Sequence, residues 1–554
     1  MLGGPAITDA RFERGRPFPP EFRTADRLRL SACRGEYEPT TFVLYTDEPR
    51  ANVRVTATDL KGREGTIPSV AVDLRVVKYW YQAGDFGKPE GRLPAYDIAM
   101  LLPELLLKDD NLVVVNHEQR KNYMRIDGEL VDVTDPTPEF NVEGWPAVEN
   151  PRLQNLAPKD AATLLPFDVG ADEIKQVFVT VHVPDKAAAG TYKGEIEVTA
   201  GPHGSLKLPM TVNVYPFDLA PCPIDYSIYT RSFIDDAPKV PCFSEQKTPE
   251  QYRAEMANLF AHGIVNPQVN DIKFERFEQA MRIREEVGMP KGHIYHHGVR
   301  IPRDELDSDE ALAKWEARIR RFSTWAREHG YGSFYAYAID EADPLLHKQR
   351  RWIEAAHRAG GKVFVSVEDD AGFFEIAGDV LDLPIMSGPV QPRIARLVQK
   401  NGHRLGIYAF PQVTWEKPEI FRRNYGIRLW LAGYDVEMTY AYQHSFGHIW
   451  NDFDYKGDYK DHCLAYPTVN GVVDTLVFEG LREAVDDTRY IATFLTESKH
   501  PDHPAEVAAS ADKWLHSLDP EQDLHEMRRK IATAIIRAMQ ERGARQVKRV
   551  AGHR

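Results

Sequence analysis

The stretch SFYAYAIDEADP, residues 333 to 344, joins a run of small and aromatic apolar residues to two adjacent acids, Asp340 and Glu341. A short apolar run rich in aromatic residues predicts a strand that is buried on both faces. The two acids follow at the point where this strand would end. They are either catalytic groups or only the polar end of a buried strand, and the surrounding sequence has to distinguish these interpretations.

Seven comparable apolar stretches surround this one, and helical patterns separate them. They are DYSIYTR, GIVNPQVN, GHIYHHG, KVFVSVED, LDLPIMSG, RLGIYAF and VEMTYAY. A first helix is predicted to open at Thr248, with Pro249 at its first position and Gln251 completing a capping box. The last helix is predicted in DTLVFEGLREAVDDTRYIATFL. Eight strand–helix units predict a parallel (β/α)8 barrel over residues 222–500, with Asp340 at the end of its fourth strand.

The regions on either side of this predicted barrel have different patterns. Residues 1–221 contain stretches such as NVRVTATDL, KQVFVTVHVP and GTYKGEIEVTA, in which apolar and polar residues alternate. Alternation with period two, separated by turn residues, predicts a β-sandwich. Residues 501–554 are predicted to form a helical extension, with a start signal at 519–522 and a frayed end from 542 onward.

Length and charge restrict the class of protein. A chain of 554 residues is too long for one hydrophobic core, which agrees with a multidomain protein. The formal net charge of −14 argues against nucleic acid or an anionic membrane as the main partner, since both favour a basic face. No apolar run approaches the ~20 residues of a membrane span. The amino-terminal residues contain no signal-peptide core, so we expect either a cytoplasmic protein or a secreted form without its leader.

The four cysteines are far apart and form no C-x-x-C pair; they are Cys33, Cys222, Cys242 and Cys463. This spacing does not match a zinc site or a disulfide framework, so free thiols are expected. No metal and no cofactor is predicted.

In (β/α)8 barrels, active sites lie at the carboxyl ends of the strands. Asp340 and Glu341 are predicted at such an end, directly after an aromatic run. A carboxyl group held against aromatic side chains has its neutral form favoured, which suits a general acid. The pair is therefore the candidate catalytic site.

Several stretches, taken in order, resemble one known family. YAIDEADP is similar to the Asp-Glu motif of glycoside hydrolase family 123 and the related DUF4091 proteins. CRGEYEPTTFVLYT resembles the amino-terminal strand of that family, and GTYKGEIEVTA with LPMTVNVYPFDLAP resembles the end of its β-sandwich domain. LAYPTVNG and FEGLREAVDDTRY resemble its Tyr-Pro segment and its final barrel helix. The order and spacing of these stretches extend the resemblance to about residue 495.

The resemblance implies an exo-acting, retaining β-N-acetylgalactosaminidase that uses substrate assistance. Glu341 would be the acid/base, and Asp340 would hold the 2-acetamido group of the substrate. Two departures leave the sugar open. Thr468 follows Pro467 where the family pattern has Gly, and TLVFE at 475–479 replaces a segment of the Ser-x-Arg-x-Glu kind.

Aromatic and polar residues near strand ends are candidates for binding an oligosaccharide or glycoconjugate substrate. Aromatic rings can stack on the apolar faces of sugars, although each ring alone is more often a packing residue. The predicted substrate-binding residues are Tyr337, Tyr408, Tyr440, Tyr442, Trp450, His296, Asn270 and Arg231.

Three other interpretations are weighed beside substrate assistance. An ordinary glycosidase would use Glu341 as acid and Asp340, Glu368 or Glu437 as nucleophile or base. A metal-dependent hydrolase would gather His296, Asp340 and His444. It is disfavoured because His296 and its neighbour His297 should point to opposite faces of a strand, and because no H-x-H spacing occurs. A non-catalytic carbohydrate-binding barrel is the third.

Overall fold

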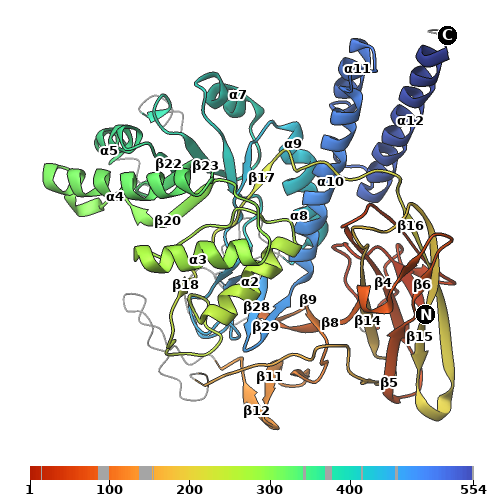
Figure 1. Ribbon diagram of the computed structural model, residues 1–554. Coiled ribbons are helices and arrows are strands. Elements are labelled where there is room, and N and C mark those ends of the chain that lie inside the picture. Colours follow the sequence, from red (N-terminus) through yellow and green to blue (C-terminus); the bar gives the residue numbers. More distant parts are fainter. Residues whose placement is uncertain are drawn as a thin grey trace.

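The computed structural model describes residues 1–13, 15–84, 99–135, 153, 155–340, 345–367, 377–413, 416–455 and 460–551. Figure 1 shows a β-rich N-terminal region on one side and a parallel sheet with its helices on the other. The helices α10, α11 and α12 lie along the boundary between them. Within the described residues, no helix has both the length and the apolar character needed to cross a bilayer.

The N-terminal region contains two large sheets and a small one. The first has the order β2-β1-β4-β14-β8-β9 and comprises β1 (Leu2–Gly4), β2 (Arg23–Thr24), β4 (Tyr37–Tyr45), β8 (Val72–Ala83), β9 (Ala99–Leu107) and β14 (Ile174–His182). The second has the order β13-β5-β15-β16-β3, with β6 and β7 at its side. It comprises β3 (Leu28–Ala32), β5 (Arg50–Ala57), β6 (Leu60–Lys61), β7 (Thr66–Ile67), β13 (Phe167–Val169), β15 (Gly190–Thr199) and β16 (Ser205–Val214). The small sheet contains β10 (Val113–Asn116), β11 (Lys121–Ile126) and β12 (Glu129–Asp132).

The two large sheets share one hydrophobic core. Phe42 and Val177 come from the first sheet, and Leu30 and Met210 come from the second, and each is at most 4% exposed. In β3 the buried residues alternate with more exposed ones, which is the period-two pattern of its sequence. Burial follows the alternation in β3 and β5, whereas residues 176–181 of β14 are all buried although their sequence was predicted to alternate.

The second region is built on a parallel sheet in the order β17-β25-β24-β23-β22-β21-β20, and all of these neighbours pair in parallel. Its strands are β17 (Asp225–Tyr226), β20 (Ile294–Arg300), β21 (Phe334–Tyr337), β22 (Lys362–Val367), β23 (Leu383–Ser387), β24 (Gly406–Ala409) and β25 (Val436–Glu437). They correspond to seven of the eight predicted strands. The other predicted strand, at 263–270, bridges both edges of the sheet. Val269 N donates to Tyr295 O at 2.8 Å, and Gln268 N donates to Ile228 O at 3.1 Å.

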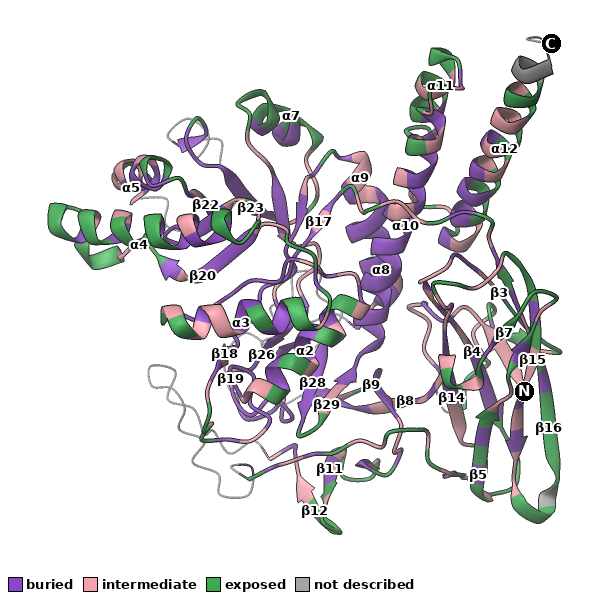
Figure 2. Ribbon diagram, viewed as in Figure 1, coloured by how far each residue is buried: buried purple, intermediate pink, exposed green. Residues whose placement is uncertain are grey.

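Helices follow most of these strands and cover the sheet. They are α2 (Pro249–Ala261), α3 (Phe274–Glu286), α4 (Asp309–Glu328), α5 (Leu346–Arg358), α7 (Pro392–Lys400), α8 (Pro418–Arg423), α9 (Leu429–Leu431) and α10 (Leu476–Ser498). The predicted capping box of α2 is confirmed, because Thr248 and Gln251 each accept the backbone N–H of the other. Figure 2 shows that α4 keeps an exposed face, whereas α8 and α10 are buried along most of their length.

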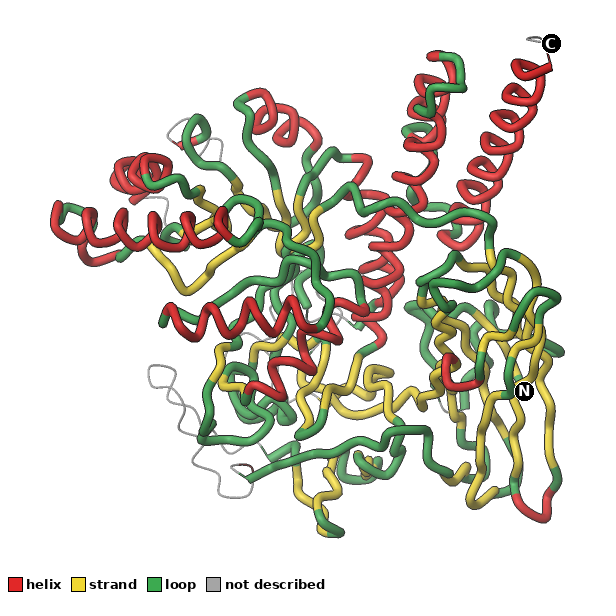
Figure 3. The backbone as a smooth tube through the Cα atoms, viewed as in Figure 1, coloured by secondary structure: helices red, strands yellow, loops and turns green. Residues whose placement is uncertain are grey.

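Short two-stranded sheets lie in the second region, and one backbone bridge joins it to the N-terminal region. The pairs are β18 (Phe233–Ile234) with β19 (Gln246–Lys247), β26 (Gln443–His444) with β27 (His462–Cys463), and β28 (Ala465–Thr468) with β29 (Gly471–Asp474). Leu105 of β9 forms an antiparallel bridge with Thr475, so a strand of the N-terminal region reaches the segment that opens α10 (Figure 3). All four cysteines are free, as the sequence predicted.

The C-terminal extension consists of α11 (Ala505–Leu515) and α12 (Leu524–Ala551). The buried residues Met527, Ile531 and Ile535 follow the predicted helical spacing. The predicted fraying from 542 is wrong, since α12 continues to Ala551. One reason is ionic: Arg542 Nε lies 2.8 Å from Glu497 Oε1 of α10, and this pair holds the distal half of α12 to the neighbouring helix.

Candidate active site

Asp340 lies just beyond the carboxyl end of β21, as the sequence predicted. Phe334 to Tyr337 are buried, and Ala338 N still donates to Phe364 O of β22 at 3.1 Å. Asp340 is exposed, because the chain leaves the sheet at this point. Glu341 lies outside the described residues, so its role stays a prediction.

Two hydroxyl groups hold the Asp340 carboxylate. The Tyr337 hydroxyl donates to Asp340 Oδ1 at 2.8 Å, and Ser366 Oγ of β22 donates to the same oxygen. Tyr337 is 1% exposed, and its hydroxyl also lies 3.3 Å from the hydroxyl of Tyr229. Burial, together with the Asp340 charge, raises the pKa of Tyr337, so the phenol stays protonated and remains a donor.

Aromatic side chains from several strand ends gather beside this carboxylate. The Tyr229 ring lies 5.3 Å from that of Tyr440, 5.8 Å from that of His297 and 6.4 Å from that of Tyr408, centroid to centroid. The rings of His297 and Tyr337 are 4.6 Å apart. The residues come from five different strands or their carboxyl ends, so only the folded sheet brings them together. Such a wall suits the apolar face of a sugar ring.

Arg231 supplies a fixed positive charge at the same end of the sheet. Its Nε lies 2.6 Å from Glu245 Oε1, and its Nη1 lies 3.4 Å from the Tyr440 hydroxyl. Burial raises the pKa of Glu245 to about 7, although Arg231 opposes this rise. The Tyr440 hydroxyl also lies 2.9 Å from His444 Nδ1.

His297 is held by two polar neighbours. Its Nδ1 lies 3.0 Å from Asn270 Oδ1, which can only accept, and Arg300 Nη2 lies 2.8 Å from both Nδ1 and Nε2. The contact with Asn270 favours a proton on Nδ1. Burial lowers the pKa of His297 well below its usual value, and Arg300 and Arg231 lower it further, so the ring is neutral.

Five of the predicted binding residues lie in this group: Tyr337, Tyr408, Tyr440, Arg231 and Asn270. His296 does not. Its ring packs against Phe322 at 5.1 Å and against Phe334 at 5.8 Å, on the helix-covered side of the sheet, and it is 0% exposed. Consecutive residues of a strand point to opposite faces, so the histidine of the site is His297. This placement also excludes a metal centre built from His296, Asp340 and His444.

The side chains of Tyr442 and Trp450 make contacts outside this group. The Tyr442 hydroxyl donates to Asn258 Oδ1 of α2 at 2.9 Å, and its ring faces Phe478 of α10. Trp450 is 0% exposed and donates to Pro467 O at 2.9 Å, inside the core shared with the N-terminal region. Both side chains therefore stabilise contacts between elements.

Glu437 and Glu368 were the other carboxylates considered as nucleophile or base. Glu437 is 0% exposed, and its Oε1 accepts from Thr439 N at 2.6 Å. Burial raises its pKa to about 8, and its charge acts on Tyr425 beside α8, on the helix side of the sheet. It is therefore poorly placed as a nucleophile or base. Glu368 lies outside the described residues.

Sequence reasoning missed Tyr229, Ser366, His297 and Arg300. A signal existed for two of them. Tyr229 precedes the predicted residue Arg231 by two positions, and Ser366 precedes Glu368 by two, so in the strands predicted from the sequence each would share a face with a residue that was considered. Arg300 lies at the end of β20, and no pattern in the sequence indicates its contact with His297.

Replacing Tyr337 with Phe tests whether this hydroxyl positions Asp340. A hydrogen bond to a charged group contributes about 1.5–3 kcal/mol, so kcat/KM is expected to fall about 10- to 100-fold. In an Asp340→Asn background the same change should cost little, because its effect acts through Asp340. Tyr442→Phe is the matched control and should leave the rate unchanged. Equal losses from Tyr337→Phe in both backgrounds would contradict this role.

Comparison with known proteins identifies the fold. No family model matches the chain, and neither does any curated protein sequence. A family 123 glycoside hydrolase from Clostridium perfringens, studied for glycolipid glycan hydrolysis, is similar in structure. Its TM-score is 0.62 at 12% sequence identity, over 94% of this chain and 95% of that one. At this identity the likeness establishes a shared fold over nearly the whole length of both chains.

Two further solved structures are less similar to this chain. A family 39 glycoside hydrolase from Bacteroides cellulosilyticus has a TM-score of 0.32 at 8% identity, over 56% of this chain and 72% of that one. A β-glucuronidase from Bifidobacterium dentium has a TM-score of 0.31 at 10% identity, over 58% and 57%.

Proposed function

We propose that this protein is an exo-acting, retaining glycoside hydrolase whose active site lies at the carboxyl end of a (β/α)8 barrel. The observation that carries the proposal is the place of Asp340. It stands at the end of β21, tied to Tyr337 and Ser366, in a chain that shares its fold with a family 123 glycoside hydrolase. The aromatic wall beside it supports a carbohydrate substrate.

The mechanism that we propose is substrate-assisted. The 2-acetamido oxygen of the sugar attacks the anomeric carbon, so no carboxylate nucleophile is needed at ~5 Å from the acid. Glu341 donates a proton to the leaving oxygen. Both hydroxyl donors bond Oδ1 of Asp340, and we assign the other oxygen, Oδ2, to the acetamide N–H. The negative carboxylate would then stabilise the positive charge that develops on the acetamide.

A panel of aryl glycosides tests the substrate class. The N-acetylgalactosaminide and the N-acetylglucosaminide are compared with the corresponding sugars that lack the acetamido group. Hydrolysis of the 2-acetamido compounds alone is expected. Equal hydrolysis of the unsubstituted sugars would favour an ordinary carboxylate pair, and no hydrolysis of any compound would favour a non-catalytic carbohydrate-binding protein.

Replacing Asp340 with Asn tests whether the attack step uses the charge of this carboxylate. The change keeps the shape of the side chain but removes its charge, which the attack step uses whatever the leaving group. Rates on activated aryl glycosides and on unactivated alkyl glycosides are therefore expected to fall by a similar factor. Ser366→Ala is a milder version of the same test, since it removes one donor to Oδ1. A nearly silent Asp340→Asn change would contradict substrate assistance.

A further inference from the structure

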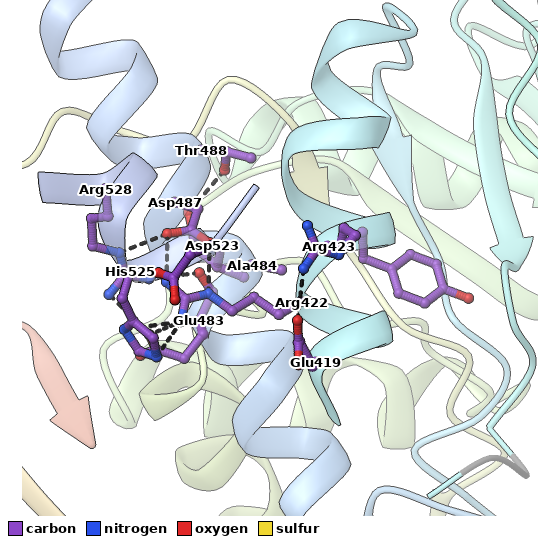
Figure 4. A network of polar contacts seen from close by, with 12 residues as sticks. Glu419, Arg422, Arg423, Glu483, Ala484, Asp487, Thr488, Asp523, His525 and Arg528 are labelled. Carbon is purple, nitrogen blue, oxygen red and sulfur yellow. Dashed lines mark hydrogen bonds and ion pairs between the residues drawn. The ribbon is translucent and has the colours of Figure 1, made fainter. Parts of the chain in front are cut away.

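A buried ionic cluster joins the N-terminal region, the parallel-sheet region and the C-terminal extension. Figure 4 shows its residues on α8, α10 and α12. We call it the junction cluster. Four carboxylates and two guanidinium groups form it, none of them more than 7% exposed, and one histidine lies beside them. Its members are Glu36, Glu38, Arg422, Glu483, Asp487, His525 and Arg528.

Two arginines connect the carboxylates of the cluster. Arg528 Nη1 of α12 lies 3.0 Å from Glu38 Oε2 of β4 and 2.9 Å from Glu483 Oε2 of α10. Arg528 Nε lies 2.6 Å from Asp487 Oδ1, and Arg422 Nε lies 2.8 Å from Asp487 Oδ2. The contact of Arg528 with Glu38 joins residues 490 positions apart in the chain, and its contact with Asp487 joins residues 41 apart.

The charges of the junction cluster do not balance. Its four carboxylates and two guanidinium groups leave an excess of two negative charges, 4 minus 2. Asp486 does not change this count, because Arg489 pairs with it at 2.9 Å. Burial of uncompensated charge is costly and raises the pKa of Glu36 and of Glu38, so either bound protons or a bound cation must neutralise the excess.

The junction cluster also contains a set of atoms suited to bind a cation. Glu38, Glu483 and His525 each offer a ligand atom, and these atoms lie within 4.8 Å of one another. Glu483 is 0% exposed, and its Oε1 makes no hydrogen bond to any described residue. Arg422 Nη1 lies 3.3 Å from Nδ1 and 3.2 Å from Nε2 of His525, a position in line with neither nitrogen. Both residues thus retain coordinating capacity.

We propose that the junction cluster binds one divalent transition-metal ion, with Zn²⁺ as the best match, through Glu38, Glu483 and His525. One imidazole and two carboxylates are an ordinary zinc ligand set, and water would be the fourth ligand. Bonds of about 2.1 Å place tetrahedral ligands about 3.4 Å apart, which flexible glutamate side chains reach by shifts of about 1 Å. The two positive charges of the ion equal the two negative charges that the cluster has in excess.

The three ligands come from different parts of the chain. Glu38 belongs to β4, Glu483 to α10 and His525 to the first turn of α12. An ion at this position would join the three parts of the protein and would act on stability, away from the proposed active site. His525 is only partly buried, so the ion has a route from the surface.

A second group of similar composition serves as a contrast. His262, Asp474 and Glu479 also offer atoms within 4.8 Å of one another. There, however, Asp474 pairs with Arg75, and Glu479 pairs with Arg482. Two carboxylates face two guanidinium groups, so no excess charge favours a cation, and we assign this group a structural role.

Metal content and thermal unfolding of the full-length protein test the proposal. The protein is dialysed against a chelator, incubated with Zn²⁺, Mn²⁺, Ca²⁺ or Mg²⁺ in turn, freed of loose metal and analysed by mass spectrometry. We expect about one Zn²⁺ per chain and a Tm several degrees above that of the chelated protein, since a ligand that binds only the folded state stabilises it. Weaker responses are expected for Ca²⁺ and Mg²⁺, which prefer oxygen ligands.

His525→Ala should lose both the bound ion and the rise in Tm. His516→Ala, at the exposed end of α11, is the matched control and should keep both. Equal zinc binding by wild type and His525→Ala would overturn the proposal. It would also be overturned if Tm fell between pH 6 and 9 without any response to metal, since protons would then neutralise the cluster. Neither readout depends on glycosidase activity, so the result is independent of the proposed function.

Discussion

Glu341→Gln is expected to lower kcat about 10²- to 10⁴-fold on glycosides with poor leaving groups, the usual contribution of general acid catalysis. Gln has nearly the same shape as Glu but cannot give up a proton to the glycosidic oxygen. Activated aryl leaving groups depart without protonation, so their rates should fall much less. The measurement is a plot of log kcat against leaving-group pKa, which should be steeper for the variant than for the wild type.

A second Asp-Glu pair in the chain offers a control. Glu310, on the exposed face of α4, follows Asp309 and pairs with Lys314 at 2.7 Å. Glu310→Gln should leave both rate and slope unchanged. Equal losses for activated and unactivated substrates in Glu341→Gln would remove Glu341 from the role of proton donor. Asp340 or an acid outside the described residues would then have to supply the proton.

Arg528→Met is expected to lower the free energy of unfolding by about 3–5 kcal/mol, the cost of removing one partner from a buried ionic group. Methionine keeps much of the volume of the side chain, so the loss is mainly electrostatic. Glu38, Glu483 and Asp487 would then remain buried with Arg422 as their nearest guanidinium. Urea unfolding can be followed by tryptophan fluorescence, because Trp430 and Trp514 pack in the core beside α12.

The neighbouring residue is a matched control for this change. Arg529 is 67% exposed in its side chain and pairs with Glu526 along the same helix. Arg529→Met should change stability by less than about 0.5 kcal/mol, as is usual for surface ion pairs. In the chelated protein, adding Glu483→Gln to Arg528→Met should restore part of the lost stability, since it removes one of the unpaired charges. If Arg528→Met were as mild as Arg529→Met, the junction cluster would not hold α12 in place.

The sequence predicted much of the architecture because strand and helix patterns are local. Apolar runs separated by helical patterns located the strands of the parallel sheet, and Thr248 with Gln251 located the start of α2. The segment 263–270 was predicted as a strand, and it lies between β17 and β20 without forming a regular strand of its own. Backbone hydrogen bonds on both sides hold this segment in place, which explains its strand-like apolar pattern. Too few of its residues are paired for it to form a regular strand.

The candidate site was predicted less completely, for a geometric reason. Strand periodicity shows that His296 and His297 point to opposite faces, but not which of them faces the helices. Tyr442 and Trp450 are aromatic residues near a strand end, as are Tyr408 and Tyr440, and sequence alone cannot separate the two pairs. Their different roles follow from packing against α2, α10 and the N-terminal region.

The sequence by itself determined that two acids follow a buried strand, because a hydrophobic run and its polar end are adjacent in the chain. Only the tertiary structure decided what surrounds them. Ser366 reaches Asp340 across 26 residues, and Tyr229 reaches Tyr337 across 108. The junction cluster is the extreme case, since Arg528 and Glu38 are 490 residues apart and meet only when three parts of the chain pack together. The charge balance of such a cluster is determined only in the folded protein. No local pattern in the sequence shows which side chains will be buried together.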